Sequence, residues 1–184
     1  MNYEENGTYT VEDYCALPED VRAELIDGFL IFSEMPTVTH QAIIGEVYFH
    51  IKSYIRKKGG SCKPYFSPIG VRLDKDNKTM LEPDLIILCD PSKSDGRHIH
   101  GAPDFVLEVV SPSSRSRDYL VKLNKYYYAG VREYWIIDPK HQNVSVYLFH
   151  GTDEEFDHIT YTFDDKIPVS IFDDLVIDFK ELDF

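Results

Sequence analysis

Residues 105–110 read Phe-Val-Leu-Glu-Val-Val, a run that is apolar at every position except Glu108. Side chains alternate along a strand, so Phe105, Leu107 and Val109 share one face while Glu108 lies between two valines on the other. A carboxylate within such a strand is costly unless it faces a ligand, a partner or the wet edge of the sheet.

Hydrophobic spacing predicts the elements around this strand. Apolar side chains recur every three or four residues over 39–58, which is typical of an amphipathic helix, and two glycines would end it. Further strands are expected at 67–73, 81–88, 134–137 and 144–149, and a second helix at 116–129 with Leu120, Leu123, Tyr127 and Tyr128 on its buried face. The order helix, three strands, helix, strand predicts an α/β or α+β fold with a mixed β-sheet flanked by helices.

Smaller elements are expected at both ends of the chain. The Asp27-Gly28 pair between two apolar runs is a strong turn signal and predicts an N-terminal hairpin over 23–33. A short helix is expected near 10–17. The tail from 160 onward should form a meander of short strands or a small helix.

Length and cysteine usage limit the class of protein. A chain of 184 residues predicts one domain, residues 1–184, with a core at about 24–149 and a C-terminal extension at 150–184. The three cysteines, Cys15, Cys62 and Cys89, are odd in number and widely spaced, so we expect neither a disulfide nor a zinc site. The chain shows no signal-peptide pattern and no apolar run near the ~18 residues of a membrane span. These features predict a soluble, cytoplasmic protein.

The charge balance at first argues against a nucleic-acid partner. The chain has 32 Asp and Glu against 19 Lys and Arg, a formal net charge of −13, which repels polyanions at long range. The acidic residues are unevenly distributed, however. Residues 153–183 hold eleven acids and two lysines, whereas residues 115–125 hold four basic residues and one acid. If nucleic acid binds, we expect the 115–125 face to carry the affinity, with a steep salt dependence.

A second acid begins another apolar run, Pro83-Asp84-Leu-Ile-Ile-Leu, 24 residues before Glu108. If neighbouring strands bring Asp84 beside Glu108, the two like charges would raise a pKa or recruit a cation. Carboxylate oxygens are hard ligands that suit Mg²⁺ or Mn²⁺. Either acid could instead pair with an arginine or cap a loop.

Asp118 and Lys122 lie four residues apart near the start of the expected second helix, so both can occupy one helical face. From this position the Lys122 ammonium could reach back toward Glu108 and neutralise charge that develops on a phosphoryl oxygen. Taken alone, the pair could equally be an exposed ion pair with little effect on stability.

The residues together form a pattern that resembles a known family. It comprises Glu-Leu-Ile-Asp-Gly at 24–28, His40, Pro-Asp-Leu at 83–85, and the run from 102 to 139 that contains Phe-Val-Leu-Glu-Val-Val and Tyr-Trp-Ile-Ile-Asp-Pro. This pattern resembles the Uma-two family of restriction-endonuclease-type proteins in the PD-(D/E)XK nuclease superfamily, over about 24–149. The resemblance implies a restriction-endonuclease-like core and a hydrolase that cuts phosphodiester bonds of DNA with Mg²⁺ (or Mn²⁺).

The resemblance also implies roles for single residues. Asp84 and Glu108 match the two metal-binding acids, and with Lys122 they would form the catalytic centre. The superfamily's motif has a lysine two positions after its second acid, where this chain has Val110. Lys122 matches the position to which this family has moved the lysine, and Asp118 would hold Lys122 or cap its helix.

Four further residues are accessory candidates. His40 and Glu46 lie on the first long helix, where superfamily members often place an acid, but either could equally serve packing or the dimer. Arg115 and Arg117 could hold a flanking phosphate or be ordinary exposed charges.

Two functional hypotheses stay open. The first is an Mg²⁺-dependent DNA endonuclease, expected to be a homodimer because a two-fold pair suits cleavage of both strands. The second is a nuclease-fold binding or assembly module without catalysis, which the net charge and Val110 favour. A glycoside hydrolase is disfavoured, because the sequence around the acids marks no aromatic platform for a sugar.

Overall fold

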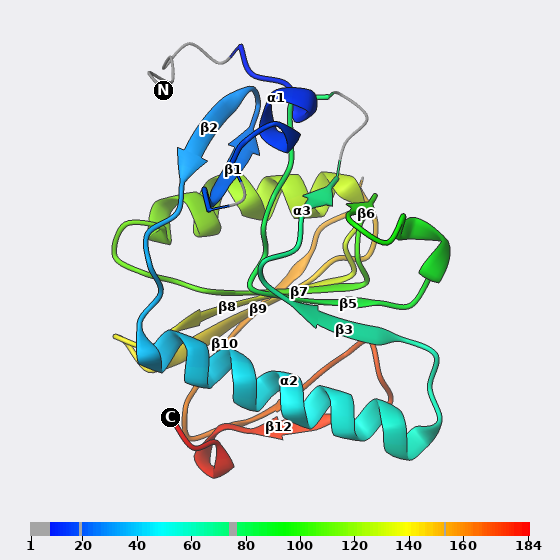
Figure 1. The fold of residues 1–184 in the computed structure, drawn as a ribbon. Coiled ribbons are helices and arrows are strands. Elements are labelled where there is room, and N and C mark those ends of the chain that lie inside the picture. Colours follow the sequence, from blue (N-terminus) through cyan, green and yellow to red (C-terminus); the bar gives the residue numbers. More distant parts are fainter. Residues whose placement is uncertain (1–7, 19, 74–76, 153) are drawn as a thin grey trace.

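The computed structural model describes residues 8–18, 20–73, 77–152 and 154–184, and a six-stranded mixed sheet forms its centre (Figure 1). In the order β10-β9-β8-β7-β5-β3, the strands are Asp157–Thr162, Asn143–Leu148, Glu133–Asp138, Phe105–Val109, Leu85–Leu88 and Lys63–Phe66. Strands β7 and β8 are parallel, and the other neighbouring pairs in this sheet are antiparallel. The predicted mixed sheet is confirmed.

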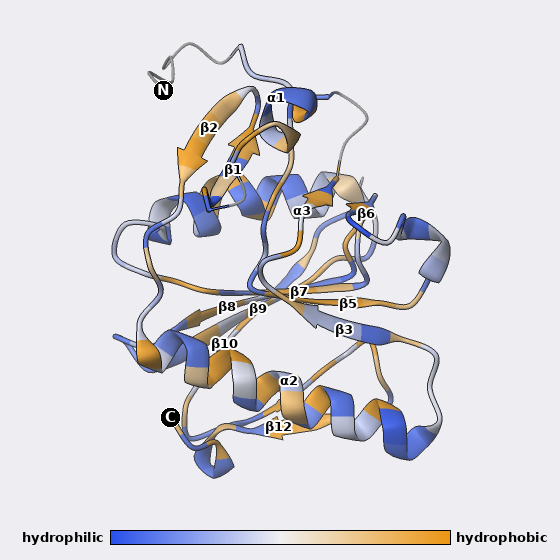
Figure 2. Cartoon of the chain, in the orientation of Figure 1, coloured by the Kyte–Doolittle hydropathy of each residue, from blue (hydrophilic) through white to orange (hydrophobic). Residues whose placement is uncertain are grey.

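Two layers cover the sheet, and the sheet contributes apolar side chains to both. The hydrophobic colouring of the central strands agrees with this (Figure 2). Helix α2 (Val38–Lys58) and strands β11 (Lys166–Pro168) and β12 (Val176–Asp178) lie on one face, and helix α3 (Leu123–Ala129) lies on the other (Figure 1). Phe105, Leu107 and Val109 pack on the α2 side, whereas Val106 and Val110 pack on the α3 side. The alternation predicted for residues 105–110 is therefore confirmed.

Helix α2 begins and ends at the residues that its sequence favours. The Thr37 hydroxyl accepts a hydrogen bond from the His40 N–H at 3.1 Å, and Gly59 ends the helix in the left-handed region at φ 65°. Its buried residues follow the predicted spacing and are Ile43, Ile44, Val47, Ile51 and Ile55. Among the residues that the structure describes, no helix has the length and apolar character needed to cross a membrane.

The N-terminal hairpin forms as predicted, from β1 (Ala23–Ile26) and β2 (Phe29–Phe32). Asp27 and Gly28 both have positive φ, 51° and 86°, as a tight two-residue hairpin turn requires. Leu25 exchanges two backbone hydrogen bonds of 2.8 Å with Met80, which fastens the hairpin to the segment before β5. The short helix α1 (Val11–Cys15) precedes it, with Thr10 and Asp13 forming a capping box.

The strand prediction at 67–73 is wrong in position. The sheet strand is β3, and residues 67–70 leave the sheet, where Pro68 has no N–H to donate to a ladder. Residues 71 and 72 form β4 (Val71–Arg72), which pairs in parallel with β6 (Ile99–His100) in a separate small sheet. Strand β5 starts at Leu85 rather than at 81, because Pro83 interrupts the ladder before it.

The buried face predicted for the second helix is correct only in part, since Leu123 and Tyr127 pack partly buried against the core whereas Leu120 and Tyr128 do not. The first part of this helix, η2 (Arg117–Lys122), is π-helical and continues into α3, so the side chains turn relative to a regular α-helix. Leu120 and Tyr128, expected in the core, are 64% and 67% exposed. The buried residues are instead Asp118, Lys122 and Tyr126.

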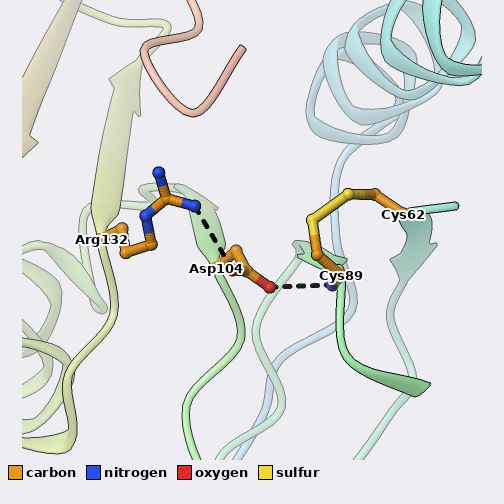
Figure 3. Close-up of a disulfide and its surroundings, with 4 residues drawn as sticks. All are labelled: Cys62, Cys89, Asp104 and Arg132. Atoms are coloured by element: carbon orange, nitrogen blue, oxygen red, sulfur yellow. Dashed lines mark hydrogen bonds and ion pairs between the residues drawn. A yellow bond between two sulfur atoms is a disulfide. The ribbon is translucent and has the colours of Figure 1, made fainter. Parts of the chain in front are cut away.

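Cys62 and Cys89 form a disulfide, contrary to the prediction (Figure 3). The antiparallel register pairs Lys63 with Leu88, so the two cysteines come next to each other just beyond β3 and β5, with Cα atoms 4.0 Å apart. The carboxylate of Asp104 accepts a hydrogen bond from the Cys89 N–H at 2.8 Å and lies 3.6 Å from Arg132. The spacing of the cysteines did not indicate this pair, because they lie 27 positions apart in the sequence.

Two short turns and the C-terminal strands remain. The turns are the 3₁₀ elements η1 (Pro91–Lys93) and η3 (Phe179–Glu181). The C-terminal strands β11 and β12 pair antiparallel, and Ile167, Ile177 and Phe179 join the core beneath α2. The tail thus forms the meander of short strands that its sequence predicts.

Candidate active site

A cavity of ≈ 440 Å³ opens beside the start of β5 and the end of β7. Its walls come from the hairpin and the loop after β2, the first turn of α2, the loop after β7 and the π-helical segment η2. The predicted catalytic residues Asp84, Glu108 and Lys122 all line it. Residues far apart in the sequence therefore meet in one place.

Asp84 lies across from Glu108 in the sheet. The antiparallel register pairs Leu85 with Leu107, and its continuation by one position places Asp84 opposite Glu108. Asp84 Oδ2 accepts a hydrogen bond from the Val109 N–H at 2.8 Å, which holds this carboxylate against β7. From the sequence, Asp84 and Glu108 meet only if their strands are neighbours, and the observed strand register shows that they are.

Glu108 is only 4% exposed, and its Oε1 accepts two hydrogen bonds. The Lys122 ammonium donates one at 2.9 Å and the Tyr126 hydroxyl donates the other at 2.7 Å. Burial raises the pKa of Glu108 well above its ordinary value, and the neighbouring acids add to this while Lys122 acts in the opposite direction.

The Lys122 ammonium lies among three carboxylates. Its Nζ is 2.8 Å from Glu24 Oε1, 2.9 Å from Glu108 Oε1 and 3.5 Å from Asp118 Oδ1. Burial disfavours the ammonium, but these three acids outweigh it and raise the pKa of Lys122 well above its usual value. Asp118 therefore lies beside Lys122, and burial also raises the pKa of the Asp118 carboxyl.

Glu24 is the site residue that the sequence analysis missed. It comes from β1, is buried, and accepts a hydrogen bond from the Glu82 N–H at 3.0 Å in addition to its contact with Lys122. A signal was present, because an acid within the apolar run Glu-Leu-Ile is as costly to bury as Glu108 is in its own strand. Nothing in the local sequence, however, indicates that the hairpin packs over the end of β7.

The accessory candidates divide into two groups. His40 lines the cavity with Nε2 3.2 Å from Asp84 Oδ2, and Arg117 lines it with Nε 3.6 Å from Glu24 Oε2. Glu46 lies farther along α2 and is not among the cavity's lining residues, and Arg115 pairs with Asp138 outside that lining.

The carboxylates are suited to a hard divalent cation. In the part of the chain with described positions, no group of three or more His, Cys, Asp or Glu side chains is arranged to hold a metal ion. Mg²⁺ is commonly bound through one or two carboxylates, with waters and substrate phosphate oxygens as the other ligands. Among the described residues, Asp84 Oδ1 and Glu108 Oε2 have no hydrogen-bond partner, so each acid retains one oxygen for such a ligand role.

The 115–125 face is less positive than its sequence suggests. Each of its four basic residues contacts an acid within the chain: Arg115 with Asp138, Arg117 with Glu24, Lys122 with the three acids above, and Lys125 with Asp27. These contacts offset much of the positive charge that residues 115–125 carry.

The mixed sheet between helical layers is a restriction-endonuclease-like fold, and two opposed acids and a neighbouring lysine lie together in its cavity. The family model Uma2, described as "Putative restriction endonuclease", matches residues 11–179, and the chain belongs to this family. The fold is similar to the crystal structure of a "putative nuclease belonging to DUF820" from Anabaena variabilis, with a TM-score of 0.70 and 24% sequence identity over 94% of this chain and 96% of that chain. No curated protein matches the chain. Family and fold support a nuclease whose substrate is nucleic acid.

Proposed function

We propose that this protein is a divalent-metal-dependent endonuclease that hydrolyses phosphodiester bonds of DNA, with Mg²⁺ or Mn²⁺ as its cofactor. The observation that supports this most is the pairing of Asp84 with Glu108 across β5 and β7, each with one carboxylate oxygen that binds no other described group. The Lys122 Nζ lies 2.9 Å from Glu108 Oε1. Two acids and a fixed cation in one cavity suit the hydrolysis of an anionic ester.

The residues would divide the chemistry as follows. Asp84 and Glu108 would hold the metal, which when bound polarises the scissile phosphate and supplies an activated water. His40 contacts Asp84 through Oδ2 and so leaves Oδ1 available. Glu24 and Asp118 hold the Lys122 ammonium beside the cavity independently of Glu108, where it stabilises negative charge that develops on the phosphoryl oxygens.

Cleavage of supercoiled plasmid, linear duplex and RNA in Mg²⁺, Mn²⁺ or EDTA tests the proposal. We expect cleavage with either metal and none in EDTA. Asp84→Asn, Glu108→Gln and Lys122→Met should each lower the rate by at least about 100-fold, because each removes charge at the reacting phosphate. Glu46→Gln, on the same helix as His40 but outside the cavity, is the matched control. Wild-type cleavage by Asp84→Asn would contradict the proposal.

A non-catalytic binding or assembly module is the second candidate. One observation favours it. Lys122 and Tyr126 both donate hydrogen bonds to Glu108 Oε1, and this buried cluster could stabilise the fold without taking part in catalysis. The two candidates differ in their response to metal. A module with no catalytic role would bind nucleic acid with the same affinity after Asp84→Asn and would cut nothing in Mn²⁺.

We also propose a homodimer for the endonuclease, because a two-fold pair presents one site to each strand of a duplex. Sedimentation velocity of the purified chain, with and without duplex DNA, would test this. A monomer in both conditions would contradict it.

A further inference from the structure

Asp138 is a buried acid that the proposed chemistry does not use. Its side chain is only 3% exposed, at the end of β8. Strand β8 runs parallel to β7 with Val109 opposite Ile137, so Asp138 comes at the same edge of the sheet as the end of β7. The next two residues, Pro139 and Lys140, line the site cavity. Asp138 therefore lies beside the site without belonging to the Lys122 cluster.

Two segments of the chain converge on this one carboxylate. Its Oδ1 accepts a hydrogen bond from the His141 N–H at 3.1 Å, which closes the turn that carries Lys140. Its Oδ2 lies 2.8 Å from His141 Nδ1 and pairs with the Arg115 guanidinium. A buried carboxylate thus fixes the turn after β8 and an arginine from the segment after β7.

Arg115 is held in place but is only partly covered. Its guanidinium lies over the Tyr119 ring, 4.9 Å from the ring centroid, and Nη1 contacts both Asp138 and His141. Its Nε and Nη2 have no hydrogen-bond partner among the described residues, and the side chain is 44% exposed. An arginine immobilised by three neighbours has already lost most of its rotamer freedom, which favours binding of an anion by its remaining donors.

The charge at this position differs from that of the neighbouring basic residues. Arg117, Lys122 and Lys125 each contact an acid that offsets their charge. Arg115 likewise contacts an acid, Asp138, but Lys140, two residues after Asp138, is exposed with no ion-pair partner among the described residues, so Asp138 offsets only one of these two positive charges. The pair therefore carries a net positive charge at the edge of the cavity.

We propose that Arg115 and Lys140, positioned by Asp138, form a second phosphate-binding site for the nucleic-acid backbone, adjacent to the phosphodiester that is cut. The proposed function supplies the identity of the ligand, and the arrangement of Asp138, Arg115 and Lys140 supplies the site. Arg115 offers its planar fork to phosphate oxygens and Lys140 a point charge, while Asp138 and His141 act as positioning residues. Contacts of this kind fix the register of the backbone and read no sequence.

Fluorescence anisotropy of a labelled 20-bp duplex in EDTA tests this without cleavage. Arg115→Ala and Lys140→Ala should each weaken binding about three- to tenfold and lower the slope of log K against log [salt] by about one, and the double variant by about two. The matched control is Arg56→Ala/Lys57→Ala, two exposed basic residues at the far end of α2, roughly 24 Å from His40 along the helix. The control should bind as the wild type does.

The outcomes separate this site from the catalytic proposal. Unchanged affinity and salt slope in the double variant would overturn the phosphate site even if the wild type cuts DNA. An equal loss of affinity in the control variant would also overturn the phosphate site, because binding would then depend only on the protein's total charge. Loss of binding confined to the Arg115 and Lys140 variants would support the site even if no cleavage is found in any metal. Arg115→Lys should recover only part of the affinity, because it restores the positive charge without the planar set of guanidinium N–H donors.

Discussion

Lys122 is held as closely by Glu24 as by Glu108, with Nζ to Oε1 distances of 2.8 Å and 2.9 Å. Glu24 comes from the N-terminal hairpin and Glu108 from the centre of the sheet, some 80 residues later in the chain. The hairpin is therefore part of the candidate site. A metal bound through Glu108 would still leave the lysine with a second carboxylate at hydrogen-bond distance.

The first prediction concerns this second carboxylate. Glu24→Gln keeps the shape of the side chain but removes its charge, so the Lys122 ammonium should be less well held. We expect kcat for DNA cleavage to fall about 10- to 100-fold with little change in KM, because the interaction acts on the reacting phosphate more than on the rest of the substrate. Single-turnover and steady-state cleavage assays would measure both constants.

Two further variants give this prediction a control. Glu34→Gln removes an exposed acid that lines the same cavity and hydrogen-bonds Ser113, so it should leave kcat unchanged. Glu24→Asp should recover part of the rate, because it restores the charge at a slightly different position. Equal rates for Glu24→Gln and the wild type, at matched thermal stability, would mean that Glu24 serves folding only.

Local rules predicted much of the fold. Gly59 ends α2, Asp27-Gly28 forms the hairpin turn, and alternation puts Glu108 on the face opposite Leu107. Each of these features depends on backbone geometry between near neighbours. Lys122 was located through the family pattern, and the structure then places it beside Glu108.

The features that were missed depend on distant parts of the chain. Glu24 reaches Lys122 only because Leu25 pairs with Met80 and fastens the hairpin over the sheet. The disulfide depends on the register of β3 against β5, which no spacing of cysteines encodes. The exposed Leu120 follows from the π-helical turn, in which a single extra residue per turn changes the buried face.

A second prediction tests that changed face. Leu120→Ser should alter the free energy of unfolding by no more than about 0.5 kcal/mol, because the side chain is mostly exposed. Tyr126→Phe should lower the free energy of unfolding by about 1–2 kcal/mol, because it removes a buried hydrogen bond and leaves the Glu108 carboxylate with one donor fewer. Urea unfolding followed by circular dichroism would measure both. A larger loss for Leu120→Ser than for Tyr126→Phe would favour the helical face predicted from the sequence.

A third prediction concerns the disulfide. The bond between Cys62 and Cys89 closes a loop with a sequence separation of 27, so its loss should lower the free energy of unfolding by about 2–4 kcal/mol. Denaturant unfolding of Cys62→Ser/Cys89→Ser, and of the wild type with a reducing agent, should give the same shift. Cys15→Ser removes the free, exposed cysteine and is the control. No shift on reduction would indicate that the two thiols are not joined in solution.

The fourth prediction follows from the raised pKa of Asp118. Burial raises this pKa above the ordinary carboxyl value, so the folded state binds a proton more tightly than the unfolded chain does. The resulting stabilisation is fully present below the unfolded pKa of about 4 and is lost as the pH rises through the folded pKa. The wild type should therefore become less stable as the pH rises from the ordinary carboxyl range toward neutrality.

Asp118→Asn removes the buried charge while keeping its shape, and Lys122 retains Glu24 and Glu108 as partners. At pH 8 we expect the variant to unfold about 3 °C higher than the wild type, which corresponds to about 1 kcal/mol, and the difference to shrink as the pH is lowered. Asp173→Asn, at an exposed acid, should follow the wild type at every pH. Thermal unfolding between pH 5 and 8 would measure the three profiles. A variant that is less stable than the wild type at pH 8 would show that the attraction of Asp118 to Lys122 exceeds the penalty of burying its charge.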